Sequence, residues 1–252
     1  MKKRRIVIKL GSTTLTQGTS RISRGKLEDI ARQINELKED HEIIIVTSGA
    51  IAAAKHYIQL TKGNPIGVKQ ALAAIGQPVL MRFYQEVFND YEIKIGQCLL
   101  SHRDFENEQS KLNTVSTINT LIENGYLPLI NENDTIATDE IKFGDNDKLA
   151  ALTAVLLKAD LLILASDIDG LYDADPKSNP DAKLITNVRN IDSYLHLQNG
   201  SISSLGTGGI KSKIEAAKLC KPNGIELWIV NGGTEGFAVK AMKKQIKFTR
   251  VK

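Results

Sequence analysis

The sequence predicts an α/β protein, a three-layer αβα sandwich with a mainly parallel central sheet. Short runs rich in β-branched and aliphatic residues alternate along the chain with segments of helical periodicity. Several of these runs are apolar on consecutive residues, which is typical of strands buried on both faces of a parallel sheet. No low-complexity linker, internal repeat or break in composition interrupts the alternation, so we expect a single domain over residues 1–252.

The predicted strands are six short β-rich runs. In chain order they are Arg5–Leu10, Glu42–Thr47, Lys94–Leu100, Tyr126–Asn131, Leu161–Ser166 and Ile225–Val230. The C-terminal tail also alternates, with Ile246 and Phe248 on either side of Lys247, as an edge strand protected by lysines would.

The predicted helices lie between these runs. Segment 24–40 shows the clearest amphipathic pattern, because its apolar residues fall on one face. Segment 111–125 ends at Gly125, a residue suited to the position just after a helix. The remaining predicted helices are Gly67–Tyr91, which is long and rich in Ala and Leu, Asn146–Ala159 and Gly209–Cys220.

The composition is that of an ordinary globular protein. Hydrophobic residues make up 42% and charged residues 25% of 252 residues. No apolar run approaches the roughly 20 residues that span a bilayer, and the apolar run after the basic start is too short for a signal peptide. We therefore expect a cytoplasmic protein without membrane contact. Cys98 and Cys220, far apart in the sequence, are expected to be reduced, packed thiols.

The net charge of +4 is mild, but basic residues gather at the two ends, in "KKRR" and "KAMKKQIKFTRVK". A nucleic-acid patch and solvated termini are both compatible with this pattern. We favour solvated termini, so nucleic acid is not an expected partner.

Polar clusters follow most of the predicted strands. They read "KLGSTTL", "TSGAIAAAK", "NENDTIATDEIKFGDND" and "SDIDGLYDADP", and "SLGTGGIKSK" precedes the last long helix. Ligands of doubly wound sheets bind beyond the carboxyl ends of the strands. These clusters together therefore predict a ligand site at that edge more firmly than any one motif does.

Two lysines suggest that the ligand carries phosphate. The glycines of "GTGGIKSK" allow close approach of backbone N–H groups to an anion, and the segment opens a helix. A flexible turn before a capped helix is the alternative. Lys9 lies inside an apolar strand, so it either reaches the sheet edge or extends its ammonium to the surface. With Lys213 it would form two cations facing a polyphosphate.

Two further motifs have structural alternatives. "TSGA" offers the Ser48 hydroxyl and the N–H groups of Gly49 and Ala50, yet it also suits a helix N-cap. No His is placed as a base for Ser48, which excludes hydrolase chemistry. In "FGDNDK", helix capping explains one polar residue. The others suggest a ligand with an ammonium or amide group, a metal, or cationic side chains that need alignment.

The motifs in sequence order resemble the glutamate 5-kinases of the amino acid kinase family. The similar segments are "VIKLGSTTL", "VTSGAIAAAK", "KQALAAIGQ", "LINENDTIATDEIKFGDNDKLAAL", "SDIDGLYDADPKSNP" and "GTGGIKSKIEAA". They cover essentially the whole chain, and "SGAIAAA", "INEND" and "GDND" are specific to these enzymes within the family.

The resemblance implies a fold of the amino acid kinase type and phosphorylation of the L-glutamate side chain by ATP, the first step towards proline. It implies Mg²⁺ held mainly through phosphates, with no metal site made by the protein alone. It also implies a homo-oligomer, with segment 67–91 at the interface, and proline as a candidate feedback inhibitor. That segment packing only within its own chain is the alternative.

The resemblance also assigns residues to roles. The catalytic residues would be Lys9, Asp147 and Lys213. Glutamate would contact Ser48, Gly49, Ala50, Asp134, Asp145 and Asn146. The nucleotide would contact Lys9, Gly11, Ser166, Asp167, Thr207, Gly208, Gly209, Ile210, Lys211, Ser212 and Lys213. In this interpretation Asn146 holds the amino acid and Asp147 orients the two lysines.

One departure and two alternatives remain. Many bacterial relatives carry a further C-terminal PUA domain, whereas this sequence stops at Lys252, so we expect a kinase core without it. A kinase of the same fold could act on another acid or on a nucleotide monophosphate. A non-catalytic amino-acid sensor is the third interpretation, although a sensor need not keep Lys9, Lys213 and Asp147 together.

Overall fold

The structure, a computed structural model, describes residues 3–137, 146–174, 176, 179–194 and 209–252. Within this part of the chain an 8-stranded sheet has the strand order β3-β4-β2-β1-β5-β9-β10-β8. Its strands are β1 (Arg4–Leu10), β2 (His41–Thr47), β3 (Lys94–Leu100), β4 (Tyr126–Glu132), β5 (Leu161–Ser166), β8 (Asn187–Val188), β9 (Glu226–Asn231) and β10 (Thr249–Val251). A separate antiparallel pair joins β6 (Leu171–Tyr172) to β7 (Leu184–Ile185).

The pairing is parallel throughout the centre of the sheet. β1 pairs in parallel with β2 and β5, β4 with β2 and β3, and β5 with β9. β10 runs antiparallel to β9. All six strands predicted from the sequence are present, each with ends within one residue of the prediction. The predicted mainly parallel sheet is therefore confirmed.

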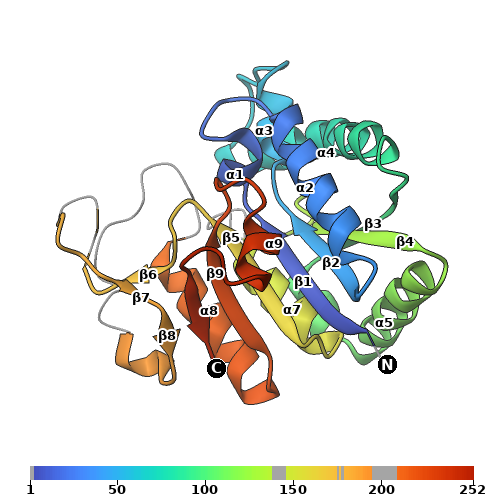
Figure 1. The fold of residues 1–252 in the computed structure, drawn as a ribbon. Helices are drawn as coiled ribbons and strands as arrows, with labels where there is room; N and C mark the ends of the chain where they lie inside the picture. Colours follow the sequence, from blue (N-terminus) through green and yellow to red (C-terminus); the bar gives the residue numbers. More distant parts are fainter. Residues whose placement is uncertain (1–2, 138–145, 175, 177–178, 195–208) are drawn as a thin grey trace.

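Helices cover both faces of the sheet (Figure 1). Their bounds are α1 (Ser12–Thr16), α2 (Arg24–Leu37), α3 (Ala50–Lys55), α4 (Pro65–Asn89), α5 (Glu108–Glu123), α7 (Asp147–Leu156), α8 (Ile210–Cys220) and α9 (Phe237–Met242). Short 3₁₀ turns lie at His102–Phe105 and Lys221–Asn223. Gly125 follows α5 with φ of +75°, so the predicted glycine sits in the left-handed region where a side chain would be strained.

Two hydrophobic cores lie on the two sides of the sheet. Ile6 and Ile8 of β1 pack in one core with α2, α4 and α9, and Val7 packs in the other with α5, α7 and α8. Successive strand residues point to opposite faces, so an unbroken apolar strand contributes to both cores. This arrangement gives the predicted three layers. Among the described residues, no helix combines the length and hydrophobicity needed to cross a membrane.

The C-terminal tail corrects one prediction. β10 begins at Thr249, after the alternating segment, and lies between β9 and β8 rather than at an edge. Phe248 packs on the Trp228 ring, with centroids 4.7 Å apart. Thr249 is buried and donates its hydroxyl to the Ile185 carbonyl oxygen. These tertiary contacts, which the local alternation cannot reveal, place the tail inside the sheet.

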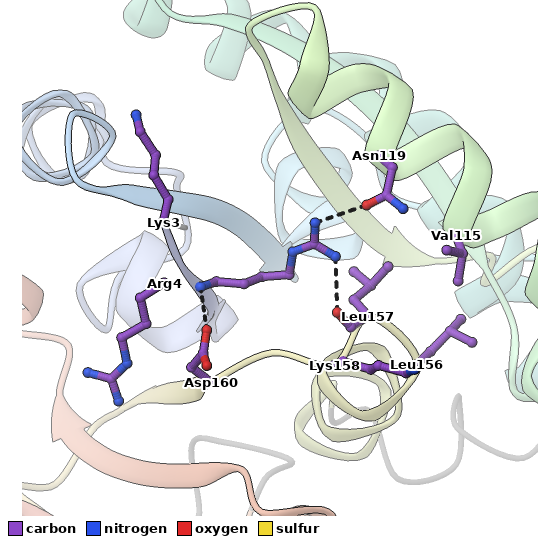
Figure 2. A pocket seen from close by; sticks show the side chains of 9 residues that line it. Lys3, Arg4, Val115, Asn119, Leu156, Leu157, Lys158 and Asp160 are labelled. Carbon is purple, nitrogen blue, oxygen red and sulfur yellow. Dashed lines mark hydrogen bonds between the residues drawn. The ribbon is translucent and has the colours of Figure 1, made fainter. Parts of the chain in front are cut away.

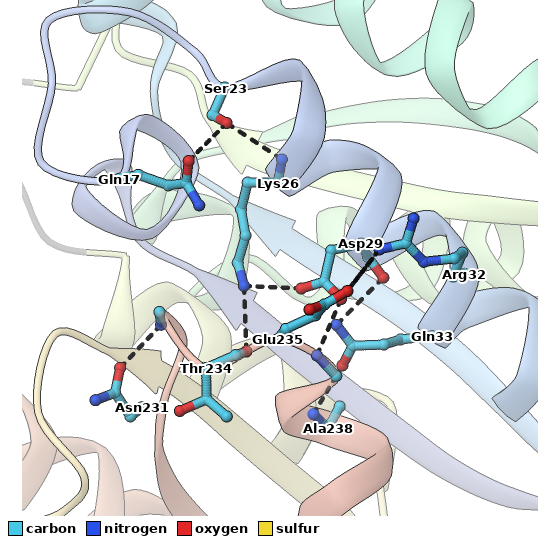
Figure 3. A network of polar contacts seen from close by, with 12 residues as sticks. Gln17, Ser23, Lys26, Asp29, Arg32, Gln33, Asn231, Thr234, Glu235 and Ala238 are labelled. Atoms are coloured by element: carbon cyan, nitrogen blue, oxygen red, sulfur yellow. Dashed lines mark hydrogen bonds and ion pairs between the residues drawn. The ribbon is translucent and has the colours of Figure 1, made fainter.

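Hydrogen bonds join a buried ion pair within α2 to the segment between β9 and α9 (Figure 3). Lys26 Nζ lies 2.8 Å from Asp29 Oδ2, and both residues are buried. Asp29 Oδ1 accepts a hydrogen bond from Gly236 N, and Gln33 Oε1 accepts one from Ala238 N. Buried charges are stable when they are paired and hydrogen-bonded. The hydrogen bonds that Asp29 and Gln33 accept therefore fix the start of α9 against α2.

Both cysteines are free thiols, as predicted. Burial raises the pKa of the Cys220 thiol to about 12, and it also raises the pKa of the half-buried Cys98. The thiolate is the reactive form of cysteine. Neither cysteine is therefore poised to act as a nucleophile at neutral pH.

Candidate active site

Parallel pairing brings the ends of neighbouring strands to one edge of the sheet. Leu10, the last residue of β1, pairs with Thr47, the last residue of β2. Val46 pairs with Ile130, which places Asn131 of β4 at the level of Thr47. Helices α1 and α3 begin at this same edge (Figure 1). The polar segments that follow β1, β2 and β4 therefore start side by side.

Lys9 reaches this edge from inside β1. It is only 6% exposed, so it does not extend its ammonium to the surface. A Cβ atom added to Gly11 would lie 3.6 Å from Lys9 Nζ, which shows that the ammonium group sits beside the turn after the strand. Of the two sequence interpretations of Lys9, the structure agrees with the one in which it reaches the sheet edge.

Asp147 stands at the centre of a buried cluster. Its Oδ1 lies 2.6 Å from Lys9 Nζ, and its Oδ2 lies 3.3 Å from Lys213 Nζ. Ser212 donates its hydroxyl to Asp147 Oδ2 at 2.9 Å. Asp147 is 1% exposed. Three elements distant in sequence, β1, α7 and α8, thus supply one carboxylate and two ammonium groups.

The lysines keep this carboxylate ionised. Burial by itself raises the pKa of Asp147, but attraction by Lys213 and Lys9, with hydrogen bonds from Lys9 and Ser212, outweighs it. The net result is a pKa well below the usual range of an aspartate. Asp147 therefore carries its negative charge at neutral pH and holds both ammonium groups in place.

Helix capping does not explain Asn146. It occupies the N-cap position of α7, but its side chain makes no capping hydrogen bond to that helix. Its Nδ2 instead donates to the Thr47 carbonyl oxygen at 2.6 Å and to Asn131 Oδ1 at 2.9 Å. Asn146 is thereby held against the ends of β2 and β4, and it is 7% exposed.

The other predicted glutamate contacts lie around the same edge. Ser48 is half-buried, and its main-chain N–H donates to the Leu10 carbonyl oxygen. Gly49 has φ of +106°, a conformation that favours glycine, and precedes Ala50, the first residue of α3. Asp134 is half-buried in the turn after β4. Asp145 lies outside the described residues.

Other predicted nucleotide contacts outside the Asp147 cluster lie at the end of β5 and at the start of α8. Ser166 ends β5 and donates its hydroxyl to Asp167, which is exposed. Gly209 and Ile210 form the start of α8. The Lys211 side chain is 69% exposed and lies 4.0 Å from Glu215, so it points away from the Asp147 cluster. Thr207 and Gly208 lie outside the described residues.

Phosphate fits the charges at this edge. Lys9 and Lys213 contribute two positive charges and Asp147 one negative charge, which leaves the trio at +1. Lys213 lies in the first turn of α8, and the N-terminus of a helix favours an anion. Among the described residues, no group of three or more His, Cys, Asp or Glu side chains is arranged to hold a metal ion.

The sequence analysis assigned no role to two residues of this network, Asn131 and Gln77, although both lie in the segments "LINEND" and "KQALAAIGQ" that carry the resemblance. Asn131 ends the predicted strand in "LINEND", and its position at a strand end was the available signal. Gln77 lies in the middle of α4 and ends the segment "KQALAAIGQ", which was the available signal for it. Asn131 Nδ2 donates to Gln77 Oε1 at 2.7 Å, so both belong to the polar network around Asn146.

A surface hollow of about 590 Å³ lies at the opposite edge of the sheet (Figure 2). Arg4, Arg5 and Asp160 line it, at the amino-terminal ends of β1 and β5. The Arg5 guanidinium forms an ion pair with Glu42 and donates to the Leu157 carbonyl oxygen. These internal contacts indicate a structural role for Arg5. The polar cluster at the carboxyl edge, not this hollow, is the candidate active site.

Sequence comparison identifies one family and many similar enzymes. The amino acid kinase family matches residues 4–231. A glutamate 5-kinase from Shewanella woodyi is 44% identical over 245 residues, covering 96% of this chain and 66% of that protein. A glutamate 5-kinase from Sodalis glossinidius is 47% identical over 234 residues, covering 92% of this chain and 64% of that protein. The chain thus spans slightly less than two thirds of the length of these relatives.

Solved structures share the fold. UMP kinase from Ureaplasma parvum superposes with a TM-score of 0.70 at 21% identity, covering 100% of this chain and 99% of that one. An isopentenyl phosphate kinase gives a TM-score of 0.67 at 20% identity, covering 99% of this chain and 100% of that one. These likenesses confirm the predicted fold class.

Proposed function

The chain belongs to the amino acid kinase family, and from this premise we propose that it phosphorylates the side-chain carboxylate of L-glutamate with ATP. The product would be γ-glutamyl phosphate, and the reaction would be the first step of proline biosynthesis. The observation that carries the proposal is the buried carboxylate of Asp147 between the ammonium groups of Lys9 and Lys213. The similarity to glutamate 5-kinases supports the choice of substrate.

The acceptor needs no general base. A glutamate side chain in water has a pKa of about 4.3, so its carboxylate is already ionised at pH 7. One of its oxygens forms the new bond to the γ-phosphorus of ATP, and the bond from that phosphorus to the bridging oxygen of ADP breaks. The protein contributes positioning and charge neutralisation. This is the work for which fixed ammonium groups are suited.

The donor side is assigned to the lysines and the elements next to them. Lys9 and Lys213 bind phosphate oxygens, and Asp147 keeps the two ammonium groups aligned. Mg²⁺ would be held mainly by phosphate oxygens and water, where it neutralises phosphate charge. The remaining proposed nucleotide contacts are Gly11, Ser166, Asp167 and the segment 207–212.

The acceptor side is assigned to Asn146 and the strand ends around it. Both hydrogens of the Asn146 amide are donated within the protein. Its oxygen is therefore the atom left to accept a hydrogen bond from the substrate ammonium group. The other proposed glutamate contacts are Ser48, Gly49, Ala50, Asp134 and Asp145.

An assay of ADP release over a panel of amino acids tests the proposal. With Mg-ATP, L-glutamate should be the preferred acceptor, and hydroxylamine should trap the acyl phosphate as a γ-hydroxamate. Aspartate, N-acetylglutamate and UMP serve as competing acceptors. Preference for one of them would replace the substrate assignment, and glutamate binding without any turnover would favour an amino-acid sensor.

Replacing Asn146 by alanine should raise the KM for glutamate more than it changes kcat. A hydrogen bond to a charged group contributes about 1.5–3 kcal/mol, which corresponds to roughly tenfold or more in KM. Steady-state kinetics with varied glutamate at saturating ATP provide the measurement. Lys148→Ala, an exposed change at the second residue of α7, is the matched control. An equal KM for wild type and Asn146→Ala would remove Asn146 from the acceptor site.

We also propose the domain organisation, location and partners of the protein. Residues 1–252 would form a single domain that acts in the cytoplasm. The chain would assemble as a homo-oligomer, and proline would act as a feedback inhibitor. Tyr57, Ile58 and Ile75 lie on and beside α3 and α4 and are 37–58% exposed, which supports an interface there. Light scattering at micromolar concentration should return at least twice the 27.7 kDa chain mass. A monomeric mass would contradict the proposed assembly.

A further inference from the structure

Three side-chain amides form a chain of hydrogen bonds from the candidate active site to helix α4. Asn146 Nδ2 donates to Asn131 Oδ1 at 2.9 Å, and Asn131 Nδ2 donates to Gln77 Oε1 at 2.7 Å. Asn131 is 2% exposed. The chain thus runs from Asn146 through a buried asparagine to a glutamine of α4.

Main-chain groups fix the direction of every bond in this chain. The Thr47 carbonyl oxygen can only accept, so the amide atom of Asn146 that lies 2.6 Å away must be Nδ2. The Glu132 main-chain N–H can only donate, so the atom of Asn131 that it meets at 2.9 Å must be Oδ1. Asn131 Nδ2 then faces Gln77, which must present its oxygen. The two main-chain contacts therefore identify the nitrogen and the oxygen of all three amides.

This direction leaves one donor over. Gln77 Nε2 is buried and has no hydrogen-bond partner among the described residues. A buried unpaired donor is destabilising, and a simple turn of the amide would not relieve it, because Nε2 would then face Asn131 Nδ2. The orientation of the Gln77 amide therefore leaves a buried donor unpaired and lowers the stability of the fold.

The position of Gln77 is fixed by its neighbour. A Cβ atom added to Gly76 would lie 1.8 Å from the Ala50 carbonyl oxygen, so the backbones of α4 and α3 are in close contact. Gln77 follows directly, so its backbone cannot move away from Asn131 without separating these helices. Helix α3 also begins with Ala50, at the carboxyl edge of the sheet. The backbone next to Gln77 is therefore also held against the start of α3, which lies at the candidate active site.

We propose that Gln77 is a positioning residue for the acceptor substrate. Its oxygen fixes the amide of Asn131, which in turn fixes that of Asn146, so that the Asn146 oxygen stays directed to the substrate. This inference rests on the proposed function, because it assumes that Asn146 contacts the acceptor. Without Gln77, Asn131 Nδ2 loses its acceptor and the Glu132 N–H alone holds the amide, so Asn131 is held less firmly in the orientation that meets Asn146.

Gln77→Met tests the inference, since methionine has a similar length and neither accepts nor donates an amide hydrogen bond. We expect the KM for L-glutamate to rise about fivefold or more, with kcat and the KM for ATP within about twofold of wild type. The melting temperature should stay within about 4 °C of wild type. Gln85→Met, the same change at an exposed site of α4, is the control and should leave all these quantities unchanged.

Asn131→Asp provides a second, independent readout. Both oxygens of a carboxylate accept hydrogen bonds, so this variant can receive Asn146 Nδ2 and Glu132 N whether or not Gln77 is present. In the Asn131→Asp background, Gln77→Met should therefore change the KM for glutamate by less than about twofold. Suppression of the Gln77→Met effect is not expected if Gln77 only packs α4.

The outcomes separate this inference from the proposed function. If wild type prefers another acceptor, the substrate assignment is wrong, and the same variants are measured with that acceptor. If wild type phosphorylates glutamate but Gln77→Met leaves its KM unchanged, the positioning role is overturned alone. A loss of melting temperature with parallel changes in kcat and both KM values would also overturn it, in favour of a purely structural role.

Discussion

Replacing Asp147 by asparagine is expected to lower kcat by about 10²-fold, because misplaced lysines no longer meet the charge that develops during transfer. It should also lower the free energy of unfolding. Lys9 and Lys213 are 6% and 4% exposed, and the substitution leaves both ammonium groups without their shared carboxylate. Breaking a buried ion pair from one side costs about 3–5 kcal/mol. Steady-state kinetics and urea unfolding of the same preparations measure the two effects.

Glu108→Gln is the matched control for this variant. Glu108 also lies in the first turn of a helix, α5, but its side chain is 84% exposed. Its replacement removes a first-turn acid and an exposed ion pair with Lys111, and each of these contributes at most about 1 kcal/mol. If Asp147→Asn is no more destabilised than Glu108→Gln and keeps its kcat, then Asp147 serves only the helix and our assignment is wrong.

The destabilisation should depend on pH. Folding holds the pKa of Asp147 below its unfolded value of about 3.9. Its charge therefore stabilises the folded state above that pH, and this contribution is lost as the pH falls towards the lower folded pKa. The difference in unfolding free energy between wild type and Asp147→Asn should be constant from pH 7 to about pH 5 and shrink below about pH 4. A difference that is the same at pH 7 and pH 3 would contradict the ion pair.

Replacing Lys213 by alanine should lower kcat by about 10² to 10³-fold, which corresponds to roughly 2.7–4 kcal/mol of transition-state stabilisation. Glutamate binding should be largely retained, because Asn146 is held by Thr47 and Asn131 of β2 and β4, whereas Lys213 is held by Asp147. The measurement is kcat at saturating ATP and glutamate, together with a calorimetric Kd for glutamate. Loss of kcat with a retained Kd assigns Lys213 to the transferred phosphate.

Lys218→Ala is the control on the same helix. Lys218 lies in the last turn of α8, with a side chain 42% exposed and paired with Asp192. Its removal should leave kcat within about twofold of wild type. A wild-type kcat for Lys213→Ala would show that the start of α8 does not reach the reacting phosphate.

Most of the fold could be predicted from local patterns. The strands were recognisable because a strand buried on both faces must be apolar at consecutive positions. Helix α2 was recognisable because it buries one face, with Leu27 and Ile30 fully or almost fully buried. The tail was misplaced because β10 is defined by its partners. Thr249 contacts β7 and Phe248 contacts β9, and the local alternation cannot predict either contact.

The site was predictable in part. Lys9 and Asp147 stood out because a charged residue inside or beside an apolar run is costly unless it has a purpose. Asn146 stood out in the same motif, but its sequence could not distinguish a helix cap from a ligand contact. Asn131 and Gln77 lie in quoted motifs but received no role, because the role of an amide depends on the groups that it meets across the fold.

By itself, the sequence determined which polar residues follow which strands, because apolar runs and helical periodicity can be recognised from local sequence. Tertiary structure alone decided which of them meet. Only the parallel register places Thr47 beside Asn131. Only the packing of α7 against both β1 and α8 sets one carboxylate between Lys9 and Lys213, which are about 200 residues apart in the sequence. Electrostatics acts through distances in space, and the charge state of Asp147 and the orientation of the Asn146 amide follow from those distances.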